Sequence, residues 1–262
     1  MHILRPLLRS FSELLFPARC LGCAEQLASS RPPLLCPNCL QGKLAIPPPF
    51  CTCCGNPLPS EENHLCLTCL DNPLAFITKA RSSFLYQEPI STLVLELKFS
   101  HNLTGLASLA ALTKETPALV DLNEPDIILP VPLHIQRLRE RGFNQSQLLA
   151  QACFPAWRKK IRFDLLKRQR PTVPQMRLSG KARRNNLHQA FCLEKPDHAQ
   201  ELKGKNILLV DDVFTTGSTL HECAKVLLEA GAREIEAFTV ARSGGAGTRV
   251  SHKKNGMTTA TV

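Results

Sequence analysis

NILLVDDVFTTGSTL, residues 206–220, is the stretch that decides the fold. Ile207 to Val210 form a short continuous apolar run, which is typical of a strand buried on both faces of a parallel sheet. Asp211 and Asp212 follow at the carboxyl end of this run, and a helical pattern begins after the hydroxyl-rich segment 215–219. This order predicts a cradle for a sugar phosphate, because backbone N–H groups and the helix dipole hold the phosphate. We expect the two carboxylates to face a ribose diol with a metal ion nearby, since they cannot favour the phosphate itself.

An ordinary strand-to-helix turn with a Ser or Thr N-cap is the simpler alternative for this stretch. A cap needs one hydroxyl, whereas four of the five residues 215–219 carry one, behind a double acid. The stretch therefore resembles the phosphoribosyl pyrophosphate (PRPP) loop of type I phosphoribosyltransferases, a strand, two acids and two further residues before a Thr/Gly/Ser-rich turn. The resemblance implies that the ligand is held by Asp211, Asp212, Val213, Phe214, Thr215, Thr216, Gly217, Ser218 and Thr219.

The composition indicates one substantial α/β domain and a small module in a chain of 262 residues, of which 44% are hydrophobic. The formal net charge is +10, and it is unevenly placed. Residues 1–75 contain five Lys/Arg and five Asp/Glu, whereas residues 134–191 contain 14 Lys/Arg and two Asp/Glu, a local charge of +12. A polyanionic partner is expected at this second segment: PRPP, nucleic acid or both.

The chain has twelve cysteines, and nine of them fall between Cys20 and Cys69. Arg5, Pro6 and Arg9 interrupt the apolar N-terminus, so no secretory signal is expected. No membrane-spanning segment is expected either, because no uninterrupted apolar run approaches the length that a span needs. We therefore expect a cytoplasmic protein in a reducing compartment, where cysteines serve as metal ligands rather than in disulfides.

Eight of these cysteines form four Cys-x2-Cys pairs at intervals of roughly a dozen residues, and two such pairs complete a tetrahedral zinc site. Sequential pairing predicts two structural Zn²⁺ sites, while the spacing also allows interleaved pairing. Cys53 is surplus. Metal would supply most of the folding energy of this small segment, and its neutral charge favours a structural clip or protein contact over a nucleic-acid-binding ribbon. In the sequential arrangement the ligands are Cys20, Cys23, Cys36 and Cys39, and then Cys51, Cys54, Cys66 and Cys69.

These patterns divide the chain into four parts, and helical or alternating apolar spacing predicts the elements within them. The parts are an amphipathic helix in residues 1–17, a Cys-rich zinc module in 18–72, an α/β domain with a parallel sheet flanked by helices in 75–242, and a disordered tail in 243–262. The expected strands are 77–86, 126–131, 207–210 and 234–241, and the expected helices are 89–99, 103–113 and 219–230.

Basic residues follow the expected strand 126–131. Arg137, Arg139 and Arg141 are predicted to lie in a short loop or turn before a helix that begins at Phe143. Guanidinium groups at the end of a parallel strand suit pyrophosphate, because their paired N–H donors match phosphate oxygens. The basic, proline-containing segment 166–191 is predicted to be a mobile lid that excludes water from the reacting sugar.

Three ordered motifs, PVPLH…R…RGFNQ, RPT…Q…R..N…AF and VDDVFTTGSTL, together with the cysteine pairs, resemble the ComF/GntX family. The resemblance covers about residues 14–242 and implies a type I phosphoribosyltransferase-like domain behind a double zinc ribbon, acting in natural competence and DNA use. It implies Mg²⁺ with PRPP, competence-machinery proteins as candidate partners, and lid residues Arg170 and Arg183. By the same resemblance, the catalytic residues would be Asp211, Asp212, Arg137 and Arg141.

Three functional hypotheses follow. One is a phosphoribosyltransferase with Mg-PRPP and an acceptor that the sequence does not identify. Another is a single-stranded-DNA-binding competence factor with PRPP as a regulatory ligand, supported by the +12 segment. The last is a scaffold without chemistry, which predicts erosion of the acids or the hydroxyl-rich turn, and both are intact. Binding of a phosphoribosyl ligand is the best-supported of these expectations.

Overall fold

The structure is a computed structural model that describes residues 17–41, 45–71, 74–99, 103–170 and 189–244. The predicted N-terminal helix, the centre of the predicted lid with Arg183, and nearly all of the predicted tail lie outside the described residues. None of the helices within the described ranges has the length and apolar character needed to span a bilayer.

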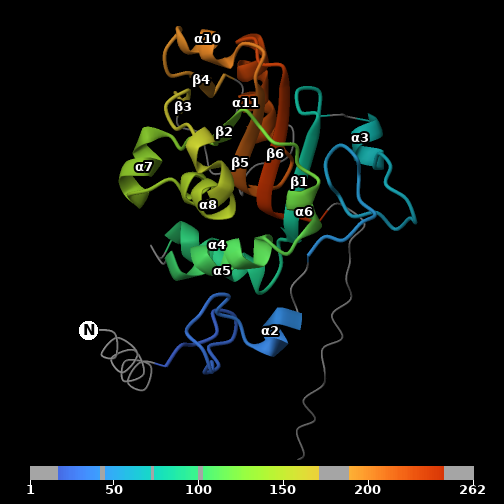
Figure 1. Ribbon diagram of the computed structural model, residues 1–262, viewed down its shortest axis with the longest axis vertical. Helices are drawn as coiled ribbons and strands as arrows, with labels where there is room; N and C mark the ends of the chain where they lie inside the picture. Colours follow the sequence, from blue (N-terminus) through green and yellow to red (C-terminus); the bar gives the residue numbers. More distant parts are fainter. Residues whose placement is uncertain (1–16, 42–44, 72–73, 100–102, 171–188, 245–262) are drawn as a thin grey trace, which may run out of the picture.

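A four-stranded parallel sheet forms the centre of the molecule, as the apolar runs predict (Figure 1). Its strands, in spatial order, are β1 (Lys79–Leu85), β6 (Glu234–Arg242), β5 (Asn206–Phe214) and β2 (Ile127–Pro130). Val210 of β5 lies opposite Pro130 on one side and Phe238 on the other, so β5 occupies an interior position. The carboxyl ends of β2, β5 and β6 therefore meet at one edge of the sheet.

Helices cover both faces of this sheet, which explains why its strands are continuously apolar. Leu208 and Val210 point into a core with α4 (Ile90–Phe99), α5 (Leu103–Thr113) and α8 (Gln145–Cys153). Ile207 and Leu209 point into the opposite core, with α11 (Ser218–Glu229). The alternation along β5 follows the two-residue period of a strand.

Shorter elements connect these layers. They are α6 (Pro117–Val120), α7 (Ile135–Arg141), a 3-10 helix at Pro155–Lys160, α10 (His198–Leu202), and the antiparallel strands β3 (Leu166–Arg168) and β4 (Phe191–Leu193). Strands β3 and β4 pair at the two ends of the predicted lid segment, so a hairpin brackets that segment.

The cysteine-rich module divides into two parts that pack on different sides of the sheet domain (Figure 1). The first cysteine ribbon, residues 17–41, contains α2 (Pro37–Gln41) and packs against α4 and α5, where Leu34 N donates to Ser108 Oγ at 3.0 Å. The second cysteine ribbon, residues 50–71, contains α3 (Leu67–Asp71) and packs beside β1, where Ala80 N donates to Cys53 O at 2.7 Å. Each ribbon shares a hydrophobic core with the sheet domain.

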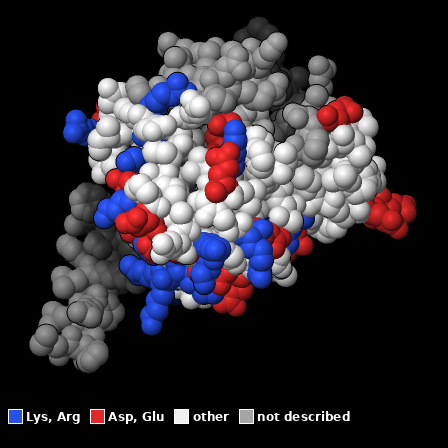
Figure 2. All heavy atoms as spheres, turned by 90° about the horizontal axis from the view of Figure 1, so that it is seen from above, with Lys and Arg blue, Asp and Glu red and all other residues white. Residues whose placement is uncertain are grey.

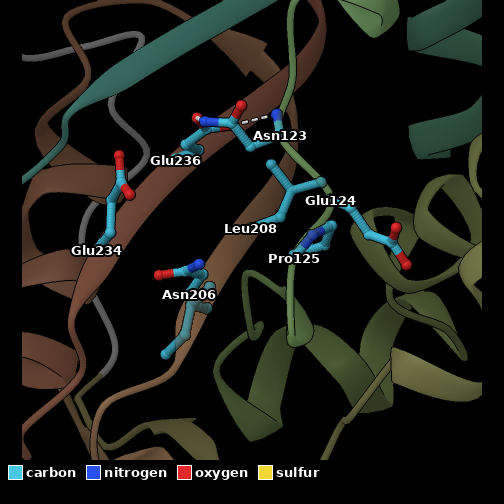
Figure 3. Close-up of a pocket in the computed structure, with 8 residues that line it drawn as sticks. Asn123, Glu124, Pro125, Asn206, Leu208, Glu234 and Glu236 are labelled. Atoms are coloured by element: carbon cyan, nitrogen blue, oxygen red, sulfur yellow. Dashed lines mark hydrogen bonds between the residues drawn. The ribbon is translucent and has the colours of Figure 1, made fainter.

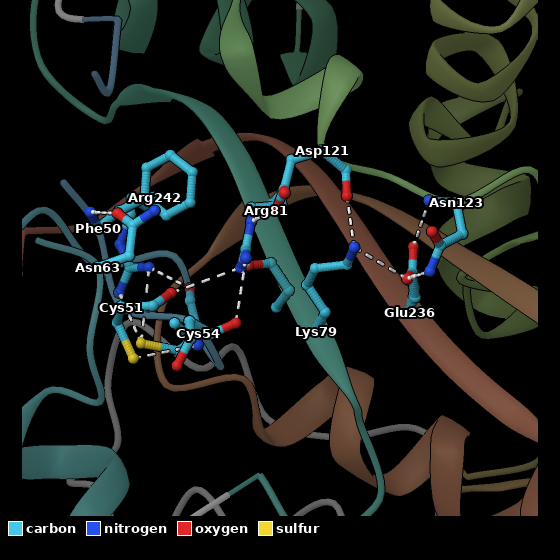
Figure 4. A network of polar contacts seen from close by, with 12 residues as sticks. Phe50, Cys51, Cys54, Asn63, Lys79, Arg81, Asp121, Asn123, Glu236 and Arg242 are labelled. Atoms are coloured by element: carbon cyan, nitrogen blue, oxygen red, sulfur yellow. Dashed lines mark hydrogen bonds and ion pairs between the residues drawn. The ribbon is translucent and has the colours of Figure 1, made fainter. Parts of the chain in front are cut away.

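The second cysteine ribbon is fixed to the sheet by two buried arginines (Figure 4). Arg81 of β1 donates to Thr52 O at 3.1 Å, pairs with Asp121, and lies 4.7 Å from the centre of the Phe50 ring. Arg242, at the end of β6, donates to Cys54 O. These contacts join the backbone of the ribbon to two strands of the central sheet.

Candidate functional site

The eight paired cysteines form two clusters, and within each cluster all four sulfurs lie within 4.8 Å of one another. Cys23 Sγ lies 3.6 Å from Cys36 Sγ, and Cys54 Sγ lies 3.8 Å from Cys66 Sγ. Four thiolates at a Zn–S distance of about 2.3 Å around a tetrahedral ion are about 3.8 Å apart, so both clusters fit zinc. The predicted sequential pairing is therefore confirmed, the interleaved alternative is wrong, and Cys53 lies outside both clusters, as expected.

Backbone N–H groups support the first thiolate of each cluster in the same way. Cys20 Sγ accepts from Cys36 N at 3.2 Å and Gly22 N at 3.4 Å, and Cys51 Sγ accepts from the N–H groups of Cys66 and Cys54. Burial raises the pKa of both thiols, but these donors outweigh burial and lower the pKa to about 6 for Cys20 and about 7 for Cys51. Donors of this kind orient metal ligands and stabilise their charge.

The remaining thiols show why each cluster needs a cation. Burial and the neighbouring thiols raise the pKa of Cys39 and of Cys69. A divalent ion offsets both effects when it is bound. Four cysteines also close the coordination shell, which leaves no position for water and marks both sites as structural.

The two acids lie within β5 rather than after it, because the strand continues four residues beyond the apolar run to Phe214. Asp212 is 5% exposed and forms an ion pair with Lys98 Nζ at 2.8 Å. It also accepts a hydrogen bond from Gln145 Nε2 at 3.3 Å. Burial lowers the pKa of Lys98, but the Asp212 carboxylate outweighs burial and the net shift is upward, so this lysine stays charged.

Asp211 has a different environment from its neighbour. Its Oδ1 accepts from Ser146 Oγ at 2.9 Å and from the backbone N–H of Asp212 at 2.9 Å. Burial and the adjacent Asp212 carboxylate raise the pKa of Asp211 to about 7. One carboxylate of the pair is therefore neutralised by a lysine, while the other is poised to change its charge near neutral pH.

The arginines after β2 lie on helix α7, and the prediction of a loop or turn was wrong. His134 caps the first turn by accepting from Gln136 N at 3.3 Å, and Gly142, with φ +78°, ends the helix. The segment IQRLRER has too few apolar residues to show a helical stripe. The only local features that indicate a helix are therefore its capping residues, His134 and Gly142. The helix places Arg137 and Arg141 one turn apart on the same face.

One arginine of α7, Arg141, lies close to the acids. Arg141 Nη1 donates to Gln145 Oε1, and the same amide group donates to Asp212, so one glutamine links the two charges. Burial lowers the pKa of Arg141, and Arg137 lowers it further. The structure thus brings Arg141 near Asp212, whereas Arg137 is half exposed and pairs with Glu140 at 3.3 Å.

Sequence reasoning missed several residues of this site. Lys98 comes from α4, Gln145 and Ser146 from the first turn of α8, and Arg168 from β3. Burial lowers the pKa of Arg168, while Cys223 and Asp211 raise it, which reflects the position of the guanidinium beside the acid. The RGFNQS pattern already contained Gln145 and Ser146, but only the tertiary fold shows that they face the acids.

The hydroxyl-rich turn after β5 forms a tight loop at the N-terminus of the 12-residue helix α11. Gly217 has φ +73°, and a Cβ atom there would lie 2.8 Å from Phe214 Cζ, so only glycine fits without displacement. Thr216 Oγ1 and Ser218 Oγ are 2.7 Å apart, and Thr215 and Thr216 are exposed. The first N–H groups of a helix have no carbonyl partner within it, so this loop offers hydroxyl and N–H donors to an anion.

A small hollow of about 10 Å³ lies at the opposite edge of the sheet (Figure 3). It lies beside Asn206 and Glu234, the first residues of β5 and β6. Its Glu236 carboxylate already accepts from Asn123 N at 3.1 Å and pairs with Lys79 at 3.2 Å. Ligands of parallel sheets bind at the carboxyl ends of the strands, so this hollow is not a candidate site.

In the described part of the basic segment, ion pairs with carboxylates neutralise several of the basic side chains. Lys160 pairs with Glu124, Arg162 with Asp164 and Glu201, and Lys167 with Glu194. Three of these carboxylates come from outside the segment, which a sequence count cannot include. Figure 2 accordingly shows basic and acidic side chains intermingled on the face that it presents.

Comparison with known proteins agrees with this geometry. The phosphoribosyl transferase domain family matches residues 167–260, and the double zinc ribbon domain family matches residues 11–70. The chain is thus a phosphoribosyltransferase-type domain that carries a double zinc ribbon.

Full-length relatives define the family further. Competence protein F of Haemophilus influenzae is 34% identical over 233 residues, which cover 87% of this chain and 98% of that protein. DNA utilization protein YhgH of Escherichia coli O157:H7 is 36% identical over 202 residues, 74% of this chain and 84% of that protein. Competence protein ComFC of Bacillus subtilis is 28% identical over 218 residues, 80% of this chain and 84% of that protein. The chain therefore belongs to the ComF family, as the sequence motifs indicate.

Proposed function

We propose that this protein binds Mg-PRPP at the carboxyl edge of the sheet. The loop 215–219 holds the 5′-phosphate, Asp211 and Asp212 receive the ribose hydroxyls, and Arg137 and Arg141 receive the pyrophosphate. One observation carries the proposal: the two acids and the hydroxyl-rich helix N-terminus of segment 211–219 lie together at the end of β5, and Arg141 of α7 reaches Asp212 through Gln145.

Electrostatics support a polyanionic ligand at this place. Lys98, Arg141 and Arg168 lie near the two acids, so cations outnumber the carboxylates of β5. Arginine forks suit pyrophosphate oxygens, and stabilisation of charge on a departing pyrophosphate favours its release. A bound Mg²⁺ ion would neutralise part of the pyrophosphate charge, and the carboxylate oxygens here are ligands of the kind that Mg²⁺ accepts.

We propose that the acid pair works asymmetrically. Lys98 holds Asp212 in place through an ion pair, while Ser146 orients Asp211. Binding of a ribose diol and a metal ion favours the ionised form of Asp211, so the ligand and the proton on this carboxylate compete. The residues of α8 thus position the acids, and the acids themselves contact the sugar.

The biological role that we propose is the use of exogenous DNA during natural competence, because relatives carry the names competence protein F and DNA utilization protein. In this role, competence-machinery proteins are the expected partners and PRPP is a substrate or regulatory ligand. Twelve free cysteines, eight of them in zinc-type clusters, are suited to the reducing cytoplasm.

Single-stranded DNA is the alternative ligand for the basic segment. Because Lys160, Arg162 and Lys167 already pair with carboxylates, the described part of the segment is a weaker electrostatic track than its sequence suggests. Binding measured at increasing salt tests this alternative, since each phosphate contact adds about 0.7 to the negative slope of log affinity against log salt for single strands.

Thermal unfolding with and without Mg-PRPP tests the proposal. Ligand at 100 times its dissociation constant stabilises the folded state by about 2.7 kcal/mol and raises the midpoint accordingly. Arg137→Ala should reduce this shift, whereas Arg139→Ala, another exposed arginine on the same helix, should leave it unchanged. No shift in the native chain, or an equal loss in both variants, would count against the proposed site.

A further inference from the structure

The two cysteine clusters differ in how far solvent reaches their sulfur atoms. In the first cysteine cluster, formed by Cys20, Cys23, Cys36 and Cys39, the Cys23 side chain is exposed and that of Cys39 is half-buried. All four ligands of the second cysteine cluster, Cys51, Cys54, Cys66 and Cys69, are buried. The reactivity of a cysteine toward oxidants follows its thiolate character and its exposure, so Cys23 is the ligand that a small oxidant reaches first.

The charges beside the two clusters also differ. Four thiolates around one divalent ion leave an excess of negative charge at each site. In the second cluster the Arg242 guanidinium lies 4.0 Å from Cys54 Sγ and offsets part of this excess. In the first cluster Glu25 Oε2 lies 3.9 Å from Cys23 Sγ and adds to it. Repulsion between like charges therefore weakens the hold of the first cluster on a metal ion and keeps the Cys23 sulfur nucleophilic.

The first cluster has a second thiol in reach of Cys23. The two sulfurs of Cys23 and Cys36 are 3.6 Å apart, and a disulfide bond is about 2.0 Å long, so they must approach by about 1.6 Å. Gly22, Cys23 and Ala24 form an exposed turn that can make this movement. Cys20 Sγ, by contrast, is held by the backbone N–H groups of Cys36 and Gly22.

The attachment of the two ribbons to the sheet domain differs in the same direction. The second cysteine ribbon is held by the buried guanidinium groups of Arg81 and Arg242, which donate to its backbone carbonyls independently of any metal. The first cysteine ribbon packs through apolar side chains and through the hydrogen bond from Leu34 N to Ser108 Oγ. Loss of a metal ion from the first cluster should therefore loosen residues 17–41, while the second ribbon stays in place.

We propose that the first cysteine cluster is an oxidant-reactive site, at which a peroxide converts Cys23 and Cys36 into a disulfide, and that the second cluster is inert under the same conditions. The reaction gives the two ribbons different roles. The second ribbon is a permanent structural element, whereas the first responds to the oxidation state of its surroundings. The inference does not depend on the ligand of the sheet domain.

The chemistry is a two-electron oxidation. The Cys23 thiolate attacks one oxygen of the peroxide, so that a sulfur–oxygen bond forms as the oxygen–oxygen bond breaks, and the displaced hydroxide takes a proton to become water. The Cys36 thiolate then attacks the resulting sulfenic acid, forms the sulfur–sulfur bond and releases a second hydroxide, which is also protonated to water. The sulfur pair loses two electrons and the peroxide gains them. Cys20 and Cys39 then remain as ligands, and two thiolates do not complete a tetrahedral shell.

Metal release from the zinc-loaded, full-length protein tests the inference, with hydrogen peroxide as the oxidant and a colorimetric indicator for zinc. About one ion per chain should be released at least about tenfold faster than the other, because only one cluster has an exposed ligand. Peptide mapping by mass spectrometry should find a disulfide between Cys23 and Cys36, with the four thiols of the second cluster still reduced. Hydrogen exchange should show lost protection in residues 17–41 and retained protection in residues 50–71.

Two pairs of proteins serve as controls. Cys53→Ser removes a half-buried thiol that belongs to neither cluster and should release metal as the native chain does. Glu25→Lys places a cation beside Cys23 and should slow the extraction of the first ion by a chelator about threefold. Glu61→Lys makes the same change at an exposed glutamate of the second ribbon and should leave that rate unchanged.

Three results would overturn the assignment. One is release of both ions at equal rates, and another is fast release without a disulfide between Cys23 and Cys36. The last is a release that Cys53→Ser slows, since oxidation would then begin outside the cluster. Equal extraction rates in Glu25→Lys and Glu61→Lys would overturn the charge argument on which the assignment rests.

Discussion

Replacement of Gly217 by alanine should destabilise the protein strongly, because two penalties add at this position. The backbone has φ +73°, which costs a residue with a Cβ about 1–2 kcal/mol. The new methyl group would lie 2.8 Å and 3.1 Å from two atoms of the Phe214 ring. That ring is buried and lies 5.0 Å from the Arg242 guanidinium, so we expect overpacking to add about 1–3 kcal/mol. We expect a total loss of about 2–5 kcal/mol in the free energy of unfolding, measured in urea.

Gly204 provides the matched control for this experiment. It has φ +70°, but no atom lies within 4 Å of a Cβ placed there, so Gly204→Ala should show only the backbone penalty of about 1–2 kcal/mol. Adding Phe214→Leu to Gly217→Ala should recover part of the loss, because a smaller side chain relieves the contact. Equal losses for the two alanine variants would refute the steric argument.

Three further predictions concern the charges and the metal clusters. Lys98→Met should lower the free energy of unfolding by about 3–5 kcal/mol, because it leaves the buried Asp212 carboxylate without its ion pair. Adding Asp212→Asn should recover most of this loss in urea unfolding. No recovery would indicate that the loss comes from packing instead. The pKa of Asp211 is about 7 in the folded state, above its unfolded value, so the folded state binds more protons and this group lowers stability as pH rises toward 7. Asp211→Asn should therefore gain thermal stability relative to the native chain between pH 5 and pH 8, and a constant difference would contradict the assignment. Cys36→Ser should reduce the zinc content from about two ions per chain to about one, whereas Cys53→Ser should leave about two by elemental analysis.

Local patterns in the sequence were sufficient for the sheet and the metal clusters. The apolar run 207–210 becomes an interior strand, and the helix predicted at 103–113 has these same limits in the structure. The spacing of the cysteine pairs predicts zinc binding without a structure, because two Cys-x2-Cys pairs are the usual ligand set of a structural zinc ion. The structure was needed only to choose sequential over interleaved pairing.

Features that depend on tertiary contacts were harder to predict from the sequence. Helix α7 has no apolar stripe, so its capping residues were the only local signal. Lys98 is 114 residues from Asp212 in sequence, and no spacing rule connects an α4 lysine with an acid on β5. Part of the positive charge of residues 134–191 is neutralised by ion pairs with Glu124, Glu194 and Glu201, which lie outside that segment in sequence.

A cavity of about 980 Å³ beside the loop 215–219 has the same origin. Leu67 and Leu70 lie in the cysteine module, about 150 residues before the loop that faces them. Their sequence context, Cys-Leu-Thr-Cys-Leu, indicates only a metal-binding turn. The cavity is therefore assembled from two segments that only the fold brings together.

Calorimetric titration of the full-length protein with PRPP, with and without Mg²⁺, tests the central claim most directly. We expect one Mg²⁺-dependent site per chain, and a loss of affinity of about tenfold or more in Thr215→Val/Thr216→Val, which removes two exposed hydroxyls from the loop. The absence of heat in the native chain, or binding that this loop variant leaves unchanged, would contradict it.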